Sequence, residues 1–146
     1  MNSSLLKGLT GLTLCVISCA SISETVATCS GSKGYTYYIE GDFIPKDKAG
    51  FAEDAISDGK LTLELIEDEF KLSMIDAAGT MQTVEGQGGR LIPMAVGESI
   101  SMLVIYDKSI EQYTFRPQDG IVTWTSARSG AFIDKHSLFV SSCNFF

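Results

Sequence analysis

The chain has 146 residues, a formal charge of −7 at pH 7, four cysteines and a single histidine. An acidic chain does not attract nucleic acid or anionic lipid through its overall charge. One histidine, no Gly-x-Ser-x-Gly motif and no phosphate-binding glycine loop argue against nucleophilic, metal or nucleotide chemistry, so we expect no enzyme activity and no cofactor.

The N-terminus has the layout of a secretory signal peptide. Lys7 precedes an apolar run over residues 9–17, which is too short to span a bilayer, and small residues follow. Cleavage is expected after Ala20 or after Ala27. In a competing interpretation, the tetrapeptide VISC ending at Cys19 is similar to a bacterial lipobox, and lipidated Cys19 tethers the protein to a membrane. Both interpretations predict a secreted or periplasmic protein.

Two cysteines remain beyond the predicted signal peptide of residues 1–27. Residues 28–146 are enough for one domain with its own core. Cys29 and Cys143 lie near its two ends, and in an oxidising compartment they predict one disulfide. Two free thiols or a metal pair are the alternatives, but a metal site needs more ligands than this pair and His136 supply, so no metal is expected.

An acidic, irregular stretch follows the first predicted strand, which covers residues 34–39. From Glu40 to Gly59 neither the strand nor the helix period is sustained, so we predict a long loop lying over the sheet. Between Glu40 and Asp76 eleven acidic residues face four lysines, and this segment accounts for the net charge of the chain. Long loops in compact domains are often functional, so a binding site is expected here.

The rest of the chain alternates short apolar strands with turn residues. Strands are predicted over residues 60–66, 70–76, 80–85, 90–96, 100–106, 110–115, 121–125 and 137–143. Their short connections predict an all-β fold, an antiparallel meander of about eight strands. A sheet of this size curls, so we expect a small barrel or a flattened sandwich, closed by the Cys29–Cys143 disulfide.

The hairpin from Ile100 to Phe115 carries the densest strand signal. Both faces of its first strand are mostly apolar, which predicts that the strand is covered on both sides. We expect the Glu40–Gly59 loop to provide the outer cover, against Leu103 or Ile105.

The loop also combines carboxylates with aromatic rings. Calcium ligation and a glycosidase carboxylate pair are two alternative functions for these carboxylates. The spacing does not match an EF-hand, and so small a meander offers no evident deep cleft. We therefore predict a non-catalytic exported β-domain that binds a protein, such as a basic one, or a small partner. The expected binding residues are Tyr38, Asp42, Phe43, Asp47, Phe51, Glu53 and Asp54.

A carrier of a small apolar ligand is the alternative function. It requires a cavity inside the barrel, lined by Leu61, Leu63, Met102 and Tyr113. A core filled by these side chains would favour the binding domain instead.

Overall fold

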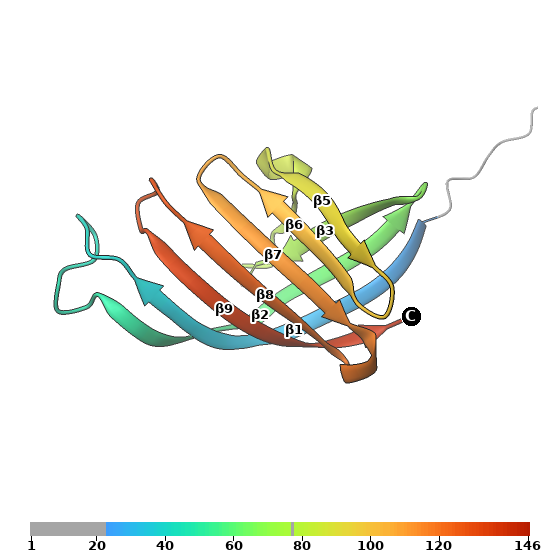
Figure 1. Ribbon diagram of the computed structural model, residues 1–146, viewed down its shortest axis with the longest axis horizontal. Coiled ribbons are helices and arrows are strands. Elements are labelled where there is room, and N and C mark those ends of the chain that lie inside the picture. The colour runs from blue at the N-terminus through green and yellow to red at the C-terminus, as the bar shows by residue number, and fades with distance from the viewer. Residues whose placement is uncertain (1–22, 77) are drawn as a thin grey trace, which may run out of the picture.

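The computed structural model describes residues 23–76 and 78–146, which form one curled β-sheet (Figure 1). The strands are β1 (Ser23–Tyr38), β2 (Gly50–Ile66), β3 (Glu69–Ile75), β4 (Met81–Thr83), β5 (Arg90–Val96), β6 (Ile100–Ile105), β7 (Ser109–Arg116), β8 (Ile121–Arg128) and β9 (Lys135–Phe145). Two short 3-10 helices, η1 (Glu85–Gln87) and η2 (Pro117–Asp119), lie in the connections before β5 and β8.

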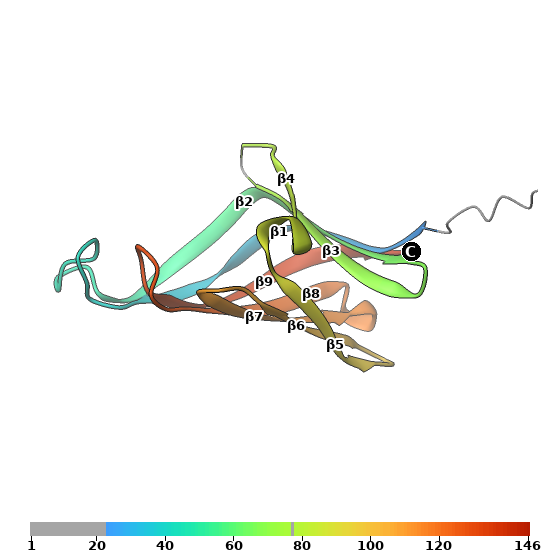
Figure 2. The same ribbon diagram turned by 90° about the horizontal axis from the view of Figure 1, so that it is seen from above.

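The predicted antiparallel meander is confirmed. The strand order across the sheet is β4-β3-β2-β1-β9-β8-β7-β6-β5, so sequence neighbours pair except β4 and β5, and the first and last strands pair in the middle. The right-handed twist curls this sheet into a half-barrel (Figure 2), with β4 and β5 as its two edges. β1 and β9 therefore pair with each other as predicted, and the half-barrel is open between β4 and β5.

Strand alternation places the core on the inner face of the curl. Met102 of β6 and Tyr113 of β7 lie opposite each other in register and are fully buried. The row continues through Trp124 and Phe139, with ring centroids 5.7 Å apart from Tyr113 to Trp124 and 4.5 Å apart from Trp124 to Phe139. Burying side chains of this size contributes about 1.5–3 kcal/mol each, which makes this face the main source of stability.

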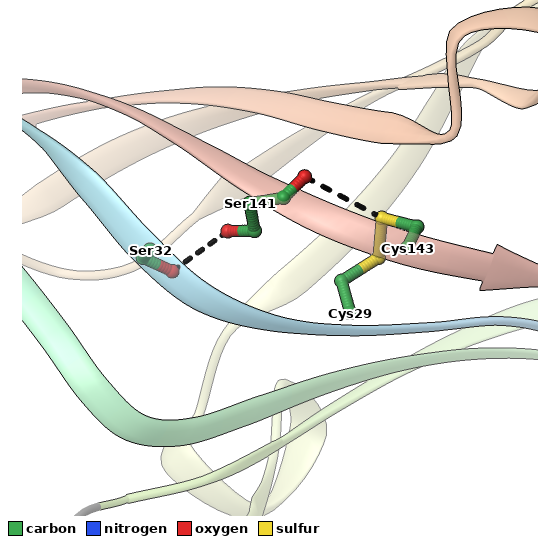
Figure 3. Close-up of a disulfide and its surroundings, with 4 residues drawn as sticks. All are labelled: Cys29, Ser32, Ser141 and Cys143. Atoms are coloured by element: carbon green, nitrogen blue, oxygen red, sulfur yellow. Dashed lines mark hydrogen bonds between the residues drawn. A yellow bond between two sulfur atoms is a disulfide. The ribbon is translucent and has the colours of Figure 1, made fainter.

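The predicted disulfide is confirmed (Figure 3). Cys29 of β1 lies opposite Cys143 of β9, and their sulfur atoms are bonded across a sequence separation of 114 residues. Beside it, the hydroxyls of Ser32 and Ser141 are hydrogen-bonded at 2.7 Å. On the loop-entropy account, such a ring stabilises the fold by about 4–5 kcal/mol.

The long loop predicted from Glu40 to Gly59 is wrong from Gly50 onward. Residues 50–56 pair with β1 as the first part of β2, so the true loop covers residues 39–49. This half of β2 is largely exposed on both faces, and it therefore shows no apolar alternation. A β-bulge between Ser30 and Ser32, with Gly31 at a φ of 67°, offsets the two halves of the β1–β2 ladder.

The first strand begins before the predicted domain boundary. β1 starts at Ser23, and fully buried Ala27 pairs with Leu63 on one side and Phe145 on the other. Most of the predicted signal peptide, including Cys19, lies outside the described residues. Within the described part of the chain, no helix is long and apolar enough to cross a membrane.

The predicted cover over the hairpin is also wrong. The outer side of β6 is open, with Ile105 exposed and Leu103 lining a surface hollow. The physical reason is that residues 50–59 lie within the sheet as part of β2, so they cannot lie across its outer face.

Candidate functional site at the loop end

The structure divides the seven predicted binding residues among three places. Neighbouring residues of a strand point to opposite faces, which separates side chains that are adjacent in sequence. The loop holds Asp42, Phe43 and Asp47, the outer face of β2 holds Phe51 and Glu53, and the inner face holds Tyr38 and Asp54.

The loop of residues 39–49 is joined by a second loop, residues 129–134, which connects β8 to β9 (Figure 1). The pairing of β1 with β9 brings them together, and the amide of Ile39 donates to the carbonyl of Asp134 at 3.0 Å. Gly41 and Ile44 exchange two backbone hydrogen bonds, at 2.9 and 3.2 Å, which closes a tight turn around Phe43. We call these two loops together the loop end.

Two exposed aromatic rings meet at the loop end. Phe43 is 59% exposed and Phe132 is 82% exposed, and their centroids lie 5.4 Å apart in an edge-to-face contact at 76°. They border a hollow of about 270 Å³ formed by both loops. Exposed phenylalanines held against each other by ordered turns are typical of binding surfaces, because removing their apolar surface from water is favourable when a partner covers them.

Phe132 was missing from the predicted site. Its local sequence, Ala131-Phe132-Ile133, is a short apolar run that does not indicate a binding site. In the structure it lies in a turn in which the carboxylate of Asp134 accepts the amide of Ala131 at 3.1 Å, and the ring is directed into solvent beside Phe43.

Carboxylates surround the aromatic pair. Glu40, Asp42 and Asp134 line the hollow, and Asp47 lies further along the first loop. Residues 40–49 also carry two lysines, so the loop end has four acidic and two basic side chains. Among the described residues, none of these six side chains forms an ion pair, so the excess negative charge is free to meet a basic surface.

Tyr38 and Asp54 contact other side chains of the sheet. The hydroxyl of Thr36 donates to Asp54 Oδ2 at 3.0 Å, and Lys135 Nζ lies 3.7 Å from the same oxygen. Lys135 also lies 5.5 Å from the centroid of the Tyr38 ring. Burial, and then the charge and hydrogen bond of Asp54, raise the pKa of Tyr38. This cluster ties β1, β2 and β9 together, and its charges are already paired within the chain.

Phe51 and Glu53 belong to a second exposed surface. Phe51 contacts Tyr37 edge-to-face at 5.0 Å, and the hydroxyl of Tyr35 donates to Glu53 at 3.4 Å. These rings border a hollow of about 640 Å³ on the outer face, whose opposite side includes Leu103 and Ile110. The structure therefore separates an aromatic outer face from the loop end.

Four residues were expected to line a carrier's internal cavity, and all four are buried in one core cluster: Leu61, Leu63, Met102 and Tyr113. Within the described residues, no three His, Cys, Asp or Glu side chains are grouped to hold a metal ion. His136 lies exposed on the outer face, near the start of β9.

Comparison with known proteins gives no relative. No protein-family model, no curated protein and no solved structure matches the chain.

Proposed function

We propose that the chain is a non-catalytic, exported binding domain that docks a basic protein partner at the loop end. The observation that carries this proposal is the exposed Phe43–Phe132 pair, held by ordered turns inside a rim of carboxylates. An aromatic centre with a charged rim is the usual anatomy of a protein interface. The rings supply affinity, and the carboxylates guide a basic surface toward them.

The shape of the loop end favours a protein over a small molecule. Its hollow of about 270 Å³ is shallow, and Phe132 projects from its border. Pockets for small ligands are generally larger, about 300–1,000 Å³, and enclose most of the ligand. A projecting ring instead suits insertion into an apolar pocket of the partner.

The location that we propose follows from the disulfide. A disulfide between Cys29 and Cys143 is typical of an oxidising compartment, which supports a secreted or periplasmic protein. Lipidation of Cys19 would hold the same domain on a membrane surface, with the loop end free to reach a partner.

Affinity capture tests the proposal with matched variants. The processed chain is immobilised, exposed to an extract of exported proteins, and the bound proteins are quantified by mass spectrometry. We expect one basic protein to be retained and the same protein to bind the purified domain. Both the Phe43→Ala/Phe132→Ala variant and the Glu40→Gln/Asp42→Asn/Asp47→Asn variant should bind it at least about tenfold more weakly.

Glu98→Gln is the matched control, because Glu98 is an exposed acid in the β5–β6 turn at the opposite end of the sheet (Figure 1). It should leave capture unchanged. Equal capture by all four proteins would show that the loop end is not the docking site.

A further inference from the structure

A continuous row of side chains, exposed except for half-buried Ala127, crosses the outer face of the half-barrel. The register of six successive strands, from β6 to β2, aligns Ile105, Ile110, Ala127, His136, Tyr37 and Phe51. A second row, two residues along each strand, runs in parallel from Leu103 to Glu53. Together these rows form what we call the outer platform.

The outer platform is apolar and uncovered. Phe51 is 82% exposed and Ile110 is 51% exposed, and the hollow of about 640 Å³ lies between the aromatic and aliphatic ends of the rows. The sequence of β6 is apolar on both faces, which is typical of a strand covered on both sides. Nothing in the described chain provides the outer cover, so another molecule is expected to do so.

The two ends of the platform are complementary to each other. The β2 end carries the aromatic rings and the carboxylate of Glu53, whereas the β6 end is aliphatic. Beyond Ile105, the register adds exposed Arg90 of edge strand β5. Arg90 has no ion pair among the described residues, and Glu53 accepts only the hydroxyl of Tyr35. The same face thus holds a positive group, Arg90, at one end and a negative group, Glu53, at the other.

We propose that a second copy of the chain covers the outer platform, with a twofold axis parallel to the strands and above β8. Arg90 and Phe51 end a row of seven strands, and Ala127 of β8 is its midpoint. The twofold axis sets Ala127 against its copy, Tyr37 against Ile105, and Arg90 against Phe51. The guanidinium group of Arg90 in one copy then reaches the ring face of Phe51 in the other copy. It also reaches the carboxylate of Glu53, which lies two residues along the same strand as Phe51.

Charge and symmetry favour a second copy over a different partner. Two chains with a formal charge of −7 each repel overall, but Glu53 is the only carboxylate in the two rows. A twofold interface requires one patch to carry both complementary ends, and this platform does so. Two sheets can stack at about 10 Å with interleaved side chains.

Analytical ultracentrifugation of the processed chain, with its disulfide intact, tests this proposal. We expect a concentration-dependent dimer. Ala127→Arg places two guanidinium groups together at the axis, and Arg90→Glu places like charges beside each other at both ends. Each should weaken association at least about tenfold. The reversed pair Arg90→Glu/Glu53→Arg should restore it, whereas Phe132→Ala at the loop end should leave it unchanged.

A wild-type chain that stays monomeric up to about 1 mM would overturn the proposal and leave the face to another molecule. Unchanged dimerisation of Ala127→Arg, or failure of the reversed pair to restore the dimer, would overturn it as well. Circular dichroism of each variant confirms that the sheet is folded. The variants at Phe43 and Phe132 change other residues than the variants at Ala127, Arg90 and Glu53. Loss of dimerisation and loss of partner capture are therefore separate results.

Discussion

At the scale of single residues, a buried carboxylate on the inner face gives two tyrosines opposite roles. Glu111 accepts the hydroxyl of Tyr113 at 2.6 Å and that of Ser126 at 3.4 Å. The buried hydroxyl of Tyr106, by contrast, has no hydrogen-bond partner among the described residues. A buried hydroxyl without a hydrogen-bond partner lowers the stability of the folded state. A hydroxyl that donates to a buried carboxylate instead avoids the free-energy cost of leaving that carboxylate unpaired.

Replacing each tyrosine with phenylalanine should separate these roles. Tyr113→Phe leaves the carboxylate of Glu111 without its shortest donor and should lower the free energy of unfolding by about 1–3 kcal/mol. Tyr106→Phe removes an unpaired hydroxyl, so stability should stay the same or rise by up to about 1 kcal/mol. Urea unfolding measures both. A Tyr106→Phe variant as destabilised as Tyr113→Phe would mean that the Tyr106 hydroxyl has a partner.

Tyr106 also predicts how stability changes in alkaline solution. Burial, and then the negative charges of Glu111 and Glu85, raise the pKa of Tyr106 to about 12. The folded-state pKa is therefore above the ordinary value of 10.0. The stability linked to this proton is complete below pH 10 and is lost as the pH rises through about 12. Urea unfolding of Tyr106→Phe between these pH values should show a smaller loss than the wild type; equal losses would contradict the assignment.

At the scale of the elements, one glycine allows β1 to pass close to β9. A Cβ atom added at Gly34 would lie 1.8 Å from the carbonyl oxygen of Leu138, which belongs to the backbone and cannot move aside. Gly34→Ala should therefore destabilise the fold by more than about 3 kcal/mol. Gly41→Ala is the matched control, because nothing lies within 4 Å of its added Cβ. Thermal melting compares them, and a mild effect at Gly34 would contradict this close approach.

The beginning of β1 gives a second prediction at this scale. Ala27 is fully buried, and the carbonyl of Val26 accepts the amide of Phe146 at 3.1 Å. A chain that starts at Thr28 loses these contacts and should melt at a lower temperature than a chain that starts at Ser23. Signal cleavage after Ala20 keeps β1 complete, and cleavage after Ala27 does not. Equal melting temperatures would show that residues 23–27 contribute nothing to the sheet.

The strands that could be predicted from the sequence are those with one face buried in the core and the other face exposed. β7 alternates between buried and more exposed residues, so its period is visible in the residues themselves. The first half of β2 is held mainly by backbone hydrogen bonds to β1 and leaves both faces exposed, so it carries no such signal. Phe43 could be predicted as part of the candidate site from its loop. Phe132 could not, because its proximity depends on the pairing of β1 with β9.

At the scale of the whole molecule, the fold separates the core from the two exposed candidate surfaces. The inner face of the half-barrel holds the core, and the disulfide links the two central strands. The loop end and the outer platform are distinct surfaces. A dimer related by an axis parallel to the strands would present both loop ends in the same direction. A partner with two sites, or two partners side by side, could then be bound with increased avidity.

The meander and the disulfide could be predicted from the whole sequence, because short connections and an even cysteine pair limit the topology. The open outer face could not. An apolar strand face indicates that something covers it, but the sequence does not say whether the cover is intramolecular. The Glu40–Gly59 loop is the cover that the sequence predicts, and the place of residues 50–59 in β2 leaves the outer side of Leu103 and Ile105 open.

Photo-crosslinking from the loop end tests the central claim most directly. Benzoylphenylalanine replaces Phe132 in the chain as it is produced and exported, and the covalent products are identified after irradiation. We expect one adduct with a basic protein, and no such adduct when the same group replaces Met94, an exposed position in β5. Absence of an adduct at Phe132, or the same adduct from Met94, would contradict docking at the loop end.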